Sequence, residues 1–268
     1  MNIENKQPAG IILSGLMVVH NEEHIIEDAL KSLHFCDEIV VVLDRCTDGT
    51  LDIVKKYADT IIEGGEAENF HIEGKRRNTG IEACKGRWVL ELDGDERISP
   101  ALADEIKMAL KTQHQDGYFL LPVRNYVGDR WVKYGWAGSF GTNTVARLFV
   151  KGCKTWGAGL VHPSITLHNN LGRLTQPIIH LVDTDINDMI DRLKRYTDAR
   201  AKDMAAAGEL PRFRTSVRKG LTRFYKSYLV RKGYKEGRMG FLLALMAMMF
   251  IILSHIKAEV ELGARPKK

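Results

Sequence analysis

Two aspartates separated by one glycine are the residues of this sequence best suited to chemistry. Within the stretch 87–96, Val89, Leu90 and Leu92 predict a short buried strand, and Asp93, Gly94 and Asp95 follow it directly. Carboxylates this close disfavour joint ionisation, and a bound cation removes that penalty. Hard divalent ions prefer such oxygen ligands, and ligands of open α/β sheets collect at the carboxyl ends of strands. The motif therefore predicts a site for a divalent metal and a phosphorylated ligand, the alternative being a surface turn.

Further polar residues follow two other predicted strands. His20, Asn21 and Glu22 come after the apolar stretch 10–19, and Asp44 comes after the β-branched stretch 38–43. If these strands are parallel, their carboxyl ends share one edge of the sheet. Asn21 also suits the N-cap of a following helix, and Asp44 also suits a turn. Both structural roles are compatible with binding.

The elements between these residues alternate in type. Apolar residues at helical spacing follow Asn21, and short runs of β-branched residues mark strands. Strand, helix, strand, helix, strand, helix, strand is typical of a parallel α/β sheet with right-handed crossovers. The order over the N-terminal third is strand 10–19, helix 25–33, strand 38–43, helix 51–57, strand 60–62, helix 74–84 and strand 88–92.

Four motifs in this order carry a family resemblance. They are Asn-Glu-Glu at 21–23, Asp-x-x-Thr-Asp-Gly-Thr at 44–50, Arg-Asn-x-Gly at 77–80 and Leu-Asp-Gly-Asp-Glu at 92–96. Together they resemble the GT-A fold of family 2 inverting glycosyltransferases. Later motifs resemble the branch with the lipopolysaccharide-core β-1,4-glucosyltransferases, namely 116–118, 124–126, 135–136, 147–149, 161–162 and 178–180.

The resemblance implies a cofactor and a set of site residues. The cofactor would be Mg²⁺ or Mn²⁺, with Asp95 as a ligand, Asp93 reaching the metal or the ribose, and His180 as a third ligand. A structural role is the alternative for His180. The donor would be a nucleotide sugar, with a UDP-sugar as the first expectation. The residues expected to bind it are His20, Asn21, Glu22, Asp44, Arg77, Asp93, Gly94 and Asp95.

The catalytic base is left open by the sequence. The related branch usually has Val-His-Glu where this chain has Val161, His162 and Pro163, so the expected acid is missing. His162 is then the candidate base, because an imidazole titrates near neutral pH. Three acids are alternatives that the sequence does not rank, namely Asp129, Asp183 and Asp185.

Three functions are consistent with these residues. The first is metal-dependent, inverting transfer of a hexose to a hydroxyl of a lipid-linked glycan, in lipopolysaccharide or envelope polysaccharide assembly. The second is sugar transfer to polyprenyl phosphate, whose acceptor oxygen is already ionised and needs no base. The third is a catalytically silent binding protein that retains the fold. The aromatic residues Trp131, Tyr134, Trp136 and Trp156 suit either sugar stacking or core packing.

Composition limits the class of protein and its location. The chain has 268 residues, of which 44% are hydrophobic and 27% charged, and this suits one large or two small globular units. The four cysteines form no C-x-x-C pair and favour a reducing compartment. The N-terminus lacks a signal pattern. We expect a GT-A catalytic domain over 1–183 and a C-terminal helical extension over 184–268.

The extension is strongly basic. Residues 191–268 contain 19 Lys and Arg against 7 Asp and Glu, whereas the rest of the chain contains 20 against 27. An aromatic stripe within the basic stretch 211–232 is typical of helices that lie on membrane surfaces. The apolar stretch 241–253 is shorter than the roughly 20 residues of a spanning helix, so we expect it to lie in the interface or pack on the body. Peripheral contact with the cytoplasmic face of an anionic membrane is the expected location. Binding to nucleic acid is not expected, because no nucleic-acid-binding module accompanies the charge.

Overall fold

The computed structural model describes most of the chain, namely residues 12–64, 72–136, 142–157, 164–208 and 210–264. The chain divides into two compact units. Unit 1 comprises residues 1–123 and 144–180, and unit 2 comprises residues 124–143 and 181–268. The division into a catalytic domain over 1–183 and an extension over 184–268 stays a prediction about function.

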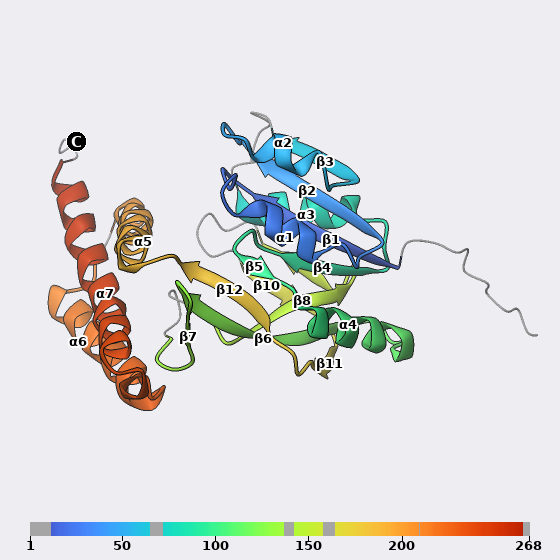
Figure 1. Ribbon diagram of the computed structural model, residues 1–268. Helices are drawn as coiled ribbons and strands as arrows, with labels where there is room; N and C mark the ends of the chain where they lie inside the picture. Colours follow the sequence, from blue (N-terminus) through green and yellow to red (C-terminus); the bar gives the residue numbers. More distant parts are fainter. Residues whose placement is uncertain (1–11, 65–71, 137–141, 158–163, 209, 265–268) are drawn as a thin grey trace, which may run out of the picture. The chain divides into compact units, whose positions relative to one another are not determined.

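The core of unit 1 is a mixed sheet with strand order β3-β2-β1-β4-β8-β6-β12-β5, and β11 pairs with β6 (Figure 1). β1, β2, β3 and β4 pair in parallel, whereas β8 runs antiparallel to both β4 and β6. Separately, β9 and β10 form a two-stranded sheet. The strands are β1 (Leu13–Val19), β2 (Glu38–Asp44), β3 (Thr60–Gly64), β4 (Trp88–Leu92), β5 (Glu96–Arg97), β6 (Tyr118–Val127), β8 (Thr144–Val150), β9 (Lys154–Trp156), β10 (Ile165–Leu167), β11 (Asn170–Arg173) and β12 (Ile178–Asp183).

Helices cover both faces of this sheet because alternate strand residues point to opposite sides. Met17 and Val41 face one side and pack in one cluster with α1 (Ile26–Ser32) and α4 (Pro100–Thr112). Leu16 faces the other side and packs with α3 (Glu73–Ala83). Strands buried on both faces read as continuous apolar runs, which is the pattern of β2. The predicted α/β fold class is therefore confirmed.

Some predicted boundaries are wrong. The helix expected directly after Asn21 begins at Ile26, so Asn21 is not its N-cap. Asn21 has φ 51°, and its side-chain oxygen accepts a hydrogen bond from the Thr47 amide (2.7 Å) instead. The next helix, α2 (Thr50–Val54), also ends earlier than expected. The sequence interpretation omitted α4, although Ser99 caps it and Pro100 opens it.

Unit 2 is mainly helical. β7 (Arg130–Val132) pairs with the end of β6, and five helical segments follow β12. Trp136 is buried in the core of this unit with Met189 and Phe250, and its indole N–H donates to the Val132 carbonyl (2.6 Å). For Trp136 the packing interpretation holds. The helices are α5 (Ile186–Ala206), α6 (Phe213–Tyr225), the π-helix η2 (Lys226–Val230), the 3-10 helix η3 (Gly233–Glu236) and α7 (Arg238–Ala264).

α7 is longer than the apolar stretch suggested. Of the described residues, one helix, spanning 238–263, is long and apolar enough to cross a membrane, and half of its most apolar window is buried inside the protein. The helix continues past Leu253 because its polar residues have partners on neighbouring helices. His255 bonds to Ser216 of α6 (3.0 Å), and Lys257 bonds to Asp198 of α5 (2.6 Å). These contacts show one face of α7 packed on α5 and α6.

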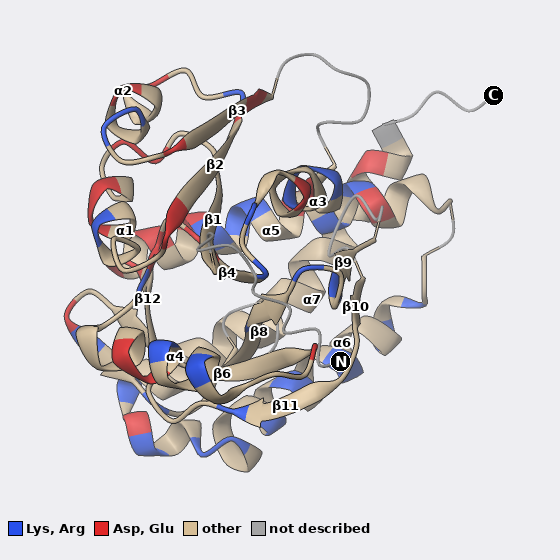
Figure 2. Ribbon diagram, turned by 90° about the vertical axis from the view of Figure 1, so that its right-hand side faces the viewer, with Lys and Arg blue, Asp and Glu red and all other residues tan. Residues whose placement is uncertain are grey.

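Charge is distributed differently on the helices of the two units. In unit 1, α1, α3 and α4 carry both signs of charge (Figure 2). In unit 2, α6 contains four basic residues of its thirteen and no acidic residue. α6 is therefore a helix on which the basic charge is not balanced by acids of the same helix.

Candidate active site

The carboxyl ends of β1 and β4 bring Glu22 against the Asp93-Gly94-Asp95 turn. The two strands are adjacent and parallel, with Met17 opposite Leu92. A Cβ at Gly94 would lie 1.5 Å from Oε2 of Glu22, so any larger residue here would displace this carboxylate. Three carboxylates from two strand ends therefore meet at one edge of the sheet, as the sequence predicted.

Glu22 carries the clearest electrostatic signature of this edge. Its burial, followed by the charges of Asp95 and Asp93, raises its pKa from 4.5 to about 8. The Oε2 atom is buried and has no hydrogen-bond partner among the described residues. A buried carboxylate oxygen without a donor is costly, and a cation or a donor group from a ligand would satisfy it.

Asp93 is held by two arginines. Arg77 donates to Oδ1 of Asp93 (3.0 Å), and Arg147 donates to Oδ2. Burial raises the pKa of Asp93, but the two guanidinium groups outweigh it and hold this pKa well below its usual range. Its backbone N–H also donates to Glu96 (3.0 Å). Asp93 is thus a fixed anion, because the protein itself neutralises its charge.

A buried ionic layer lies beneath Asp93. Glu91, inside β4, accepts hydrogen bonds from Arg77 (2.7 Å) and from Lys154 of β9. Burial raises the pKa of Glu91, but Lys154 and Arg77 lower it to about 2. The guanidinium of Arg77 also stacks 4.7 Å from the ring centre of Trp156. This layer fixes Arg77 in place, so its main contact is with the acids and it is not a solvated helix charge.

His180 lies beside Asp95, although 85 residues separate them in the sequence. β12 pairs with β5 so that His180 is opposite Glu96. Its Nε2–H donates to Oδ2 of Asp95 (3.2 Å). Burial lowers the pKa of His180, but the hydrogen bond and charge of Asp95 outweigh it and raise this pKa above 6.5. The sheet thus brings together a His and an Asp that the sequence named as metal ligands.

The loops after β1 and β2 form the second part of the site. Nδ1–H of His20 donates to the Asp44 carbonyl, and Asn21 bonds to Thr47. The buried Asp44 side chain accepts from Arg45 (2.9 Å) and lies 3.4 Å from Arg76. His20, Asn21 and Asp44 are therefore brought together, with the exposed His20 and Asn21 side chains at the surface.

Backbone strain marks both loops. Asn21 and Arg45 have φ angles of 51° and 49°, in the left-handed region that non-glycine residues seldom adopt. Asn21 lies two residues after the last residue of β1, and Arg45 directly follows the last residue of β2. The hydrogen bonds between the two loops hold both residues in place. Strained residues of this kind concentrate at ligand-binding sites.

The candidate bases are the least defined part of the site. His162 lies outside the described residues, and so do Val161 and Pro163. Asp183 is buried in a bidentate ion pair with Arg192 (2.7 and 2.9 Å), and Asp185 caps α5 by accepting from the Asp188 amide (2.9 Å). Each of these two acids therefore has a structural role in unit 2.

Three cations of the site had no role in the sequence interpretation. Arg147 binds Asp93, Lys154 binds Glu91, and Arg97 donates to the carbonyls of Gly94 and Ile25 (both 2.6 Å). Arg147 lies inside the mainly apolar strand β8, and Glu91 lies inside the mainly apolar strand β4. Single charges of opposite sign within two buried strands were the signal that could have predicted their ion-pair layer.

Among the described residues, no group of three His, Cys, Asp or Glu side chains has a geometry ready to hold a metal ion. The donor types nevertheless match a hard divalent cation, which prefers carboxylate oxygens and accepts imidazole. Glu22 with its unpartnered oxygen, Asp95 and His180 supply those donors.

The fold and this edge define an α/β protein with an acidic site at the carboxyl ends of parallel strands. Residues 14–167 match the model of glycosyl transferase family 2, which covers more than half of the chain. The chain therefore belongs to this family and is a glycosyltransferase, as the sequence motifs predicted.

The chain is also similar to individual known proteins. LpsC, a lipopolysaccharide core biosynthesis glycosyltransferase of Rhizobium meliloti, is 25% identical over 264 residues, which are 95% of each chain. An uncharacterized glycosyltransferase of Rickettsia bellii is 23% identical over 85% of this chain and 80% of its own length. The crystal structure of Staphylococcus aureus TarS is 17% identical, with a TM-score of 0.47 over 90% of this chain and 49% of that chain.

Proposed function

We propose that this glycosyltransferase moves a hexose, with inversion, from a nucleotide sugar to a hydroxyl of a lipid-linked glycan. The observation that carries the proposal is the convergence of Glu22, Asp93 and Asp95 at the ends of β1 and β4. A UDP-sugar is the first donor to test. Assembly of lipopolysaccharide or envelope polysaccharide is the proposed process, because the relative LpsC is named for lipopolysaccharide core biosynthesis.

Mg²⁺ or Mn²⁺ fits the donor set as cofactor. We assign Asp95 and His180 as its ligands, with Asp93 reaching the metal or the ribose and Glu22 bounding the same space. When bound, the cation would neutralise the charge that develops on the departing diphosphate. Asp95 suits this role because, unlike Asp93, it has no guanidinium within ion-pair distance in the described residues.

The other site residues would hold and orient the donor. His20, Asn21 and Asp44 lie on the two strained loops and would face the nucleoside. Gly94 leaves room for the Glu22 carboxylate beside the turn. Arg77 acts through Asp93, since it fixes the position and charge of that carboxylate. Such orientation matters because in-line attack requires a near-attack geometry.

His162 is the proposed catalytic base, because an imidazole takes up a proton near neutral pH. The second candidate function is transfer to polyprenyl phosphate, which is favoured by Pro163 standing where the related branch has Glu. A phosphate acceptor is ionised already. Replacement of His162 by Ala distinguishes the two, because the hydroxyl acceptor needs a base and the phosphate acceptor does not.

The test is turnover of a panel of nucleotide sugars, with and without Mn²⁺, by the wild type and by Asp95→Asn. The wild type should hydrolyse or transfer at least one donor only with the metal. Asp95→Asn should lower that rate by roughly 100-fold or more, since it removes a charged ligand and the electrostatic stabilisation that depends on it. Asp104→Asn, which changes an exposed acid of α4, is the matched control and should retain the rate. Metal-independent turnover, or full activity of Asp95→Asn, would contradict the metal role.

The proposed location is the inner face of the cytoplasmic membrane. Unit 2 exposes large apolar side chains next to the basic residues of α6, including Leu221 (56% exposed), Leu229 (49%) and Val230 (60%). Surface helices that combine apolar and basic residues bind anionic bilayers. Nucleic acid is not among the proposed partners.

A further inference from the structure

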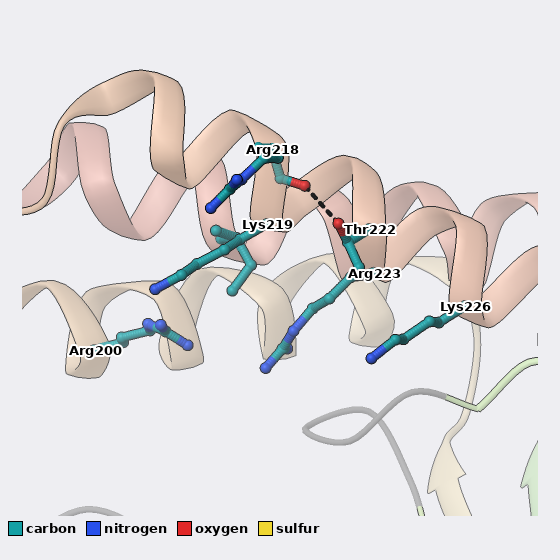
Figure 3. A pocket seen from close by; sticks show the side chains of 7 residues that line it. Arg200, Arg218, Lys219, Thr222, Arg223 and Lys226 are labelled. Carbon is teal, nitrogen blue, oxygen red and sulfur yellow. Dashed lines mark hydrogen bonds between the residues drawn. The ribbon is translucent and has the colours of Figure 1, made fainter.

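A basic pocket lies within unit 2 and shares no residue with the acidic site. It is open, measures about 600 Å³, and is lined by α5, α6, η2 and α7. Figure 3 shows the side chains of Lys219, Arg223 and Lys226 extending from the α6 side toward the side of Arg200 on α5. Its lining residues are Arg200, Arg218, Lys219, Thr222, Arg223, Lys226 and Ile251.

The cations of this pocket lack acidic partners. Within the described part of the chain, no carboxylate lies within ion-pair distance of Arg200, Arg223 or the other lining cations, although Lys257 and Arg192 of the same unit have such partners. Clustered like charges repel one another and are destabilising unless an anion binds between them. The cluster is thus an uncompensated positive site.

Arg223 is the residue at which this imbalance is greatest. Its Nη1 is buried and has no hydrogen-bond partner among the described residues. Its guanidinium and that of Arg200 stack on the same ring, 5.3 and 5.0 Å from the centre of Phe250. Burial, and then the charge of Arg200, lowers the pKa of Arg223. Stacking on Phe250 fixes the two guanidinium groups in place, while their N–H donors remain available to a ligand.

We propose that this pocket binds a phosphomonoester or diphosphate group, carried by a lipid headgroup or by a soluble phosphorylated saccharide. Two guanidinium forks recognise phosphate oxygens in bidentate fashion, and the lysines add point charges. The volume lies within the roughly 300–1,000 Å³ of small-molecule sites, so it has room for the group that bears the phosphate. The site is separate from the proposed donor site and does not rest on the proposed sugar transfer.

The first experiment measures binding of inorganic pyrophosphate to the full chain by calorimetry. Arg200→Gln/Arg223→Gln should weaken binding by about tenfold or more, which corresponds to about 1.4 kcal/mol. The matched control is Arg212→Gln/Arg214→Gln, which removes two exposed arginines of the same region outside the pocket. The control should change affinity by less than about threefold, since exposed charges that do not line the pocket act on the ligand only at long range and are screened by salt.

A second arm identifies the source of the phosphate. Flotation uses phosphatidylcholine vesicles that contain phosphatidic acid, whose headgroup is a phosphomonoester, at a salt concentration at which the wild type no longer floats with phosphatidylglycerol vesicles. If the Arg200→Gln/Arg223→Gln variant loses binding both to these vesicles and to pyrophosphate, the ligand is a headgroup. If it loses binding to pyrophosphate but still binds the vesicles, the ligand is a soluble phosphorylated saccharide. Both outcomes support the pocket.

Two results overturn the proposal. One is a wild type that binds neither pyrophosphate nor the vesicles. The other is an equal loss in the pocket variant and the control, which would mean that net charge alone is responsible. If the arginine variant does not fold, as judged by thermal unfolding, Lys219→Gln/Lys226→Gln replaces it, because both lysines are exposed and line the pocket.

Discussion

Asp93 and Asp95 are two residues apart and differ in what balances their charge. Both oxygens of Asp93 accept from guanidinium groups, whereas Asp95 contacts His180. The charge of Asp93 is therefore already compensated by the arginines. Asp95 is bonded to His180, and this hydrogen bond can be replaced by a contact with a ligand. This difference assigns a positioning role to the first acid and leaves the second as the stronger candidate for the cation.

Gly94 is expected to be essential for activity and dispensable for folding. In Gly94→Ala the new Cβ would lie 1.5 Å from Oε2 of Glu22, so the flexible end of Glu22 must move. A displacement of about 1 Å in a site can lower the rate by on the order of 100-fold. We expect kcat/KM to fall by roughly that factor in steady-state assays, while the melting temperature changes little.

Gly263→Ala is the matched control for this substitution. Gly263 is helical, and no atom lies within 4 Å of its added Cβ. It should leave activity unchanged and slightly stabilise α7, because Ala has the higher helix propensity. Equal activities of the two variants would show that the contact between Gly94 and Glu22 is not used in catalysis.

At the scale of elements, Glu91 connects α3, β4 and β9 through Arg77 and Lys154. Glu91→Gln leaves two buried cations without their shared anion. Breaking a buried ion pair in this way costs roughly 3–5 kcal/mol. We expect a loss of this size in the free energy of unfolding, measured by urea denaturation at neutral pH.

The same residue predicts a pH dependence. The folded-state pKa of Glu91 is about 2, below its ordinary value of 4.5. Its contribution to stability is therefore complete above about pH 4.5 and is lost as the pH falls toward 2. In that window Glu91→Gln should lose less stability than the wild type. The exposed Glu82→Gln should follow the wild type, and parallel curves for all three proteins would rule out this role of Glu91.

The succession of the parallel strands along the chain could be predicted because each is a short apolar run with its own turn. β2 is β-branched over 39–42 and buried at every position. The later strands β6 and β11 were missed for a physical reason. β6 alternates buried and partly exposed residues and contains Pro122, and β11 contains Gly172, so neither has a continuous apolar signal.

The acids of the site could be predicted, and their partners could not. Asp93 and Asp95 follow a strand directly, so local sequence places them at its carboxyl end. Arg147 reaches Asp93 only because β8 pairs antiparallel with β4, with Leu148 opposite Leu90. Such a register depends on the whole sheet and is not encoded in any local pattern. His180 was named from family resemblance, and β12 then brings it to Asp95.

At the scale of the whole molecule, the sequence separates charge along the chain. Residues 191–268 carry 19 basic and 7 acidic residues. This excess coincides in unit 2 with exposed apolar side chains on α6 and η2, including Leu221, Leu229 and Val230. Basic residues near an anionic surface contribute about 1 kcal/mol each, and apolar side chains add insertion energy.

This surface predicts salt-sensitive binding to anionic membranes. The full chain should float with phosphatidylglycerol vesicles at low salt, bind less as salt rises, and not bind neutral vesicles, because the electrostatic attraction is screened. Leu229→Asp/Val230→Asp should abolish flotation, since it places two negative charges where the apolar contact is proposed. The control is Ile190→Asp, an equally exposed apolar residue of α5 (53% exposed), which should still float. Binding that persists in Leu229→Asp/Val230→Asp, or that is insensitive to salt, would show that α6 and η2 do not form the membrane surface.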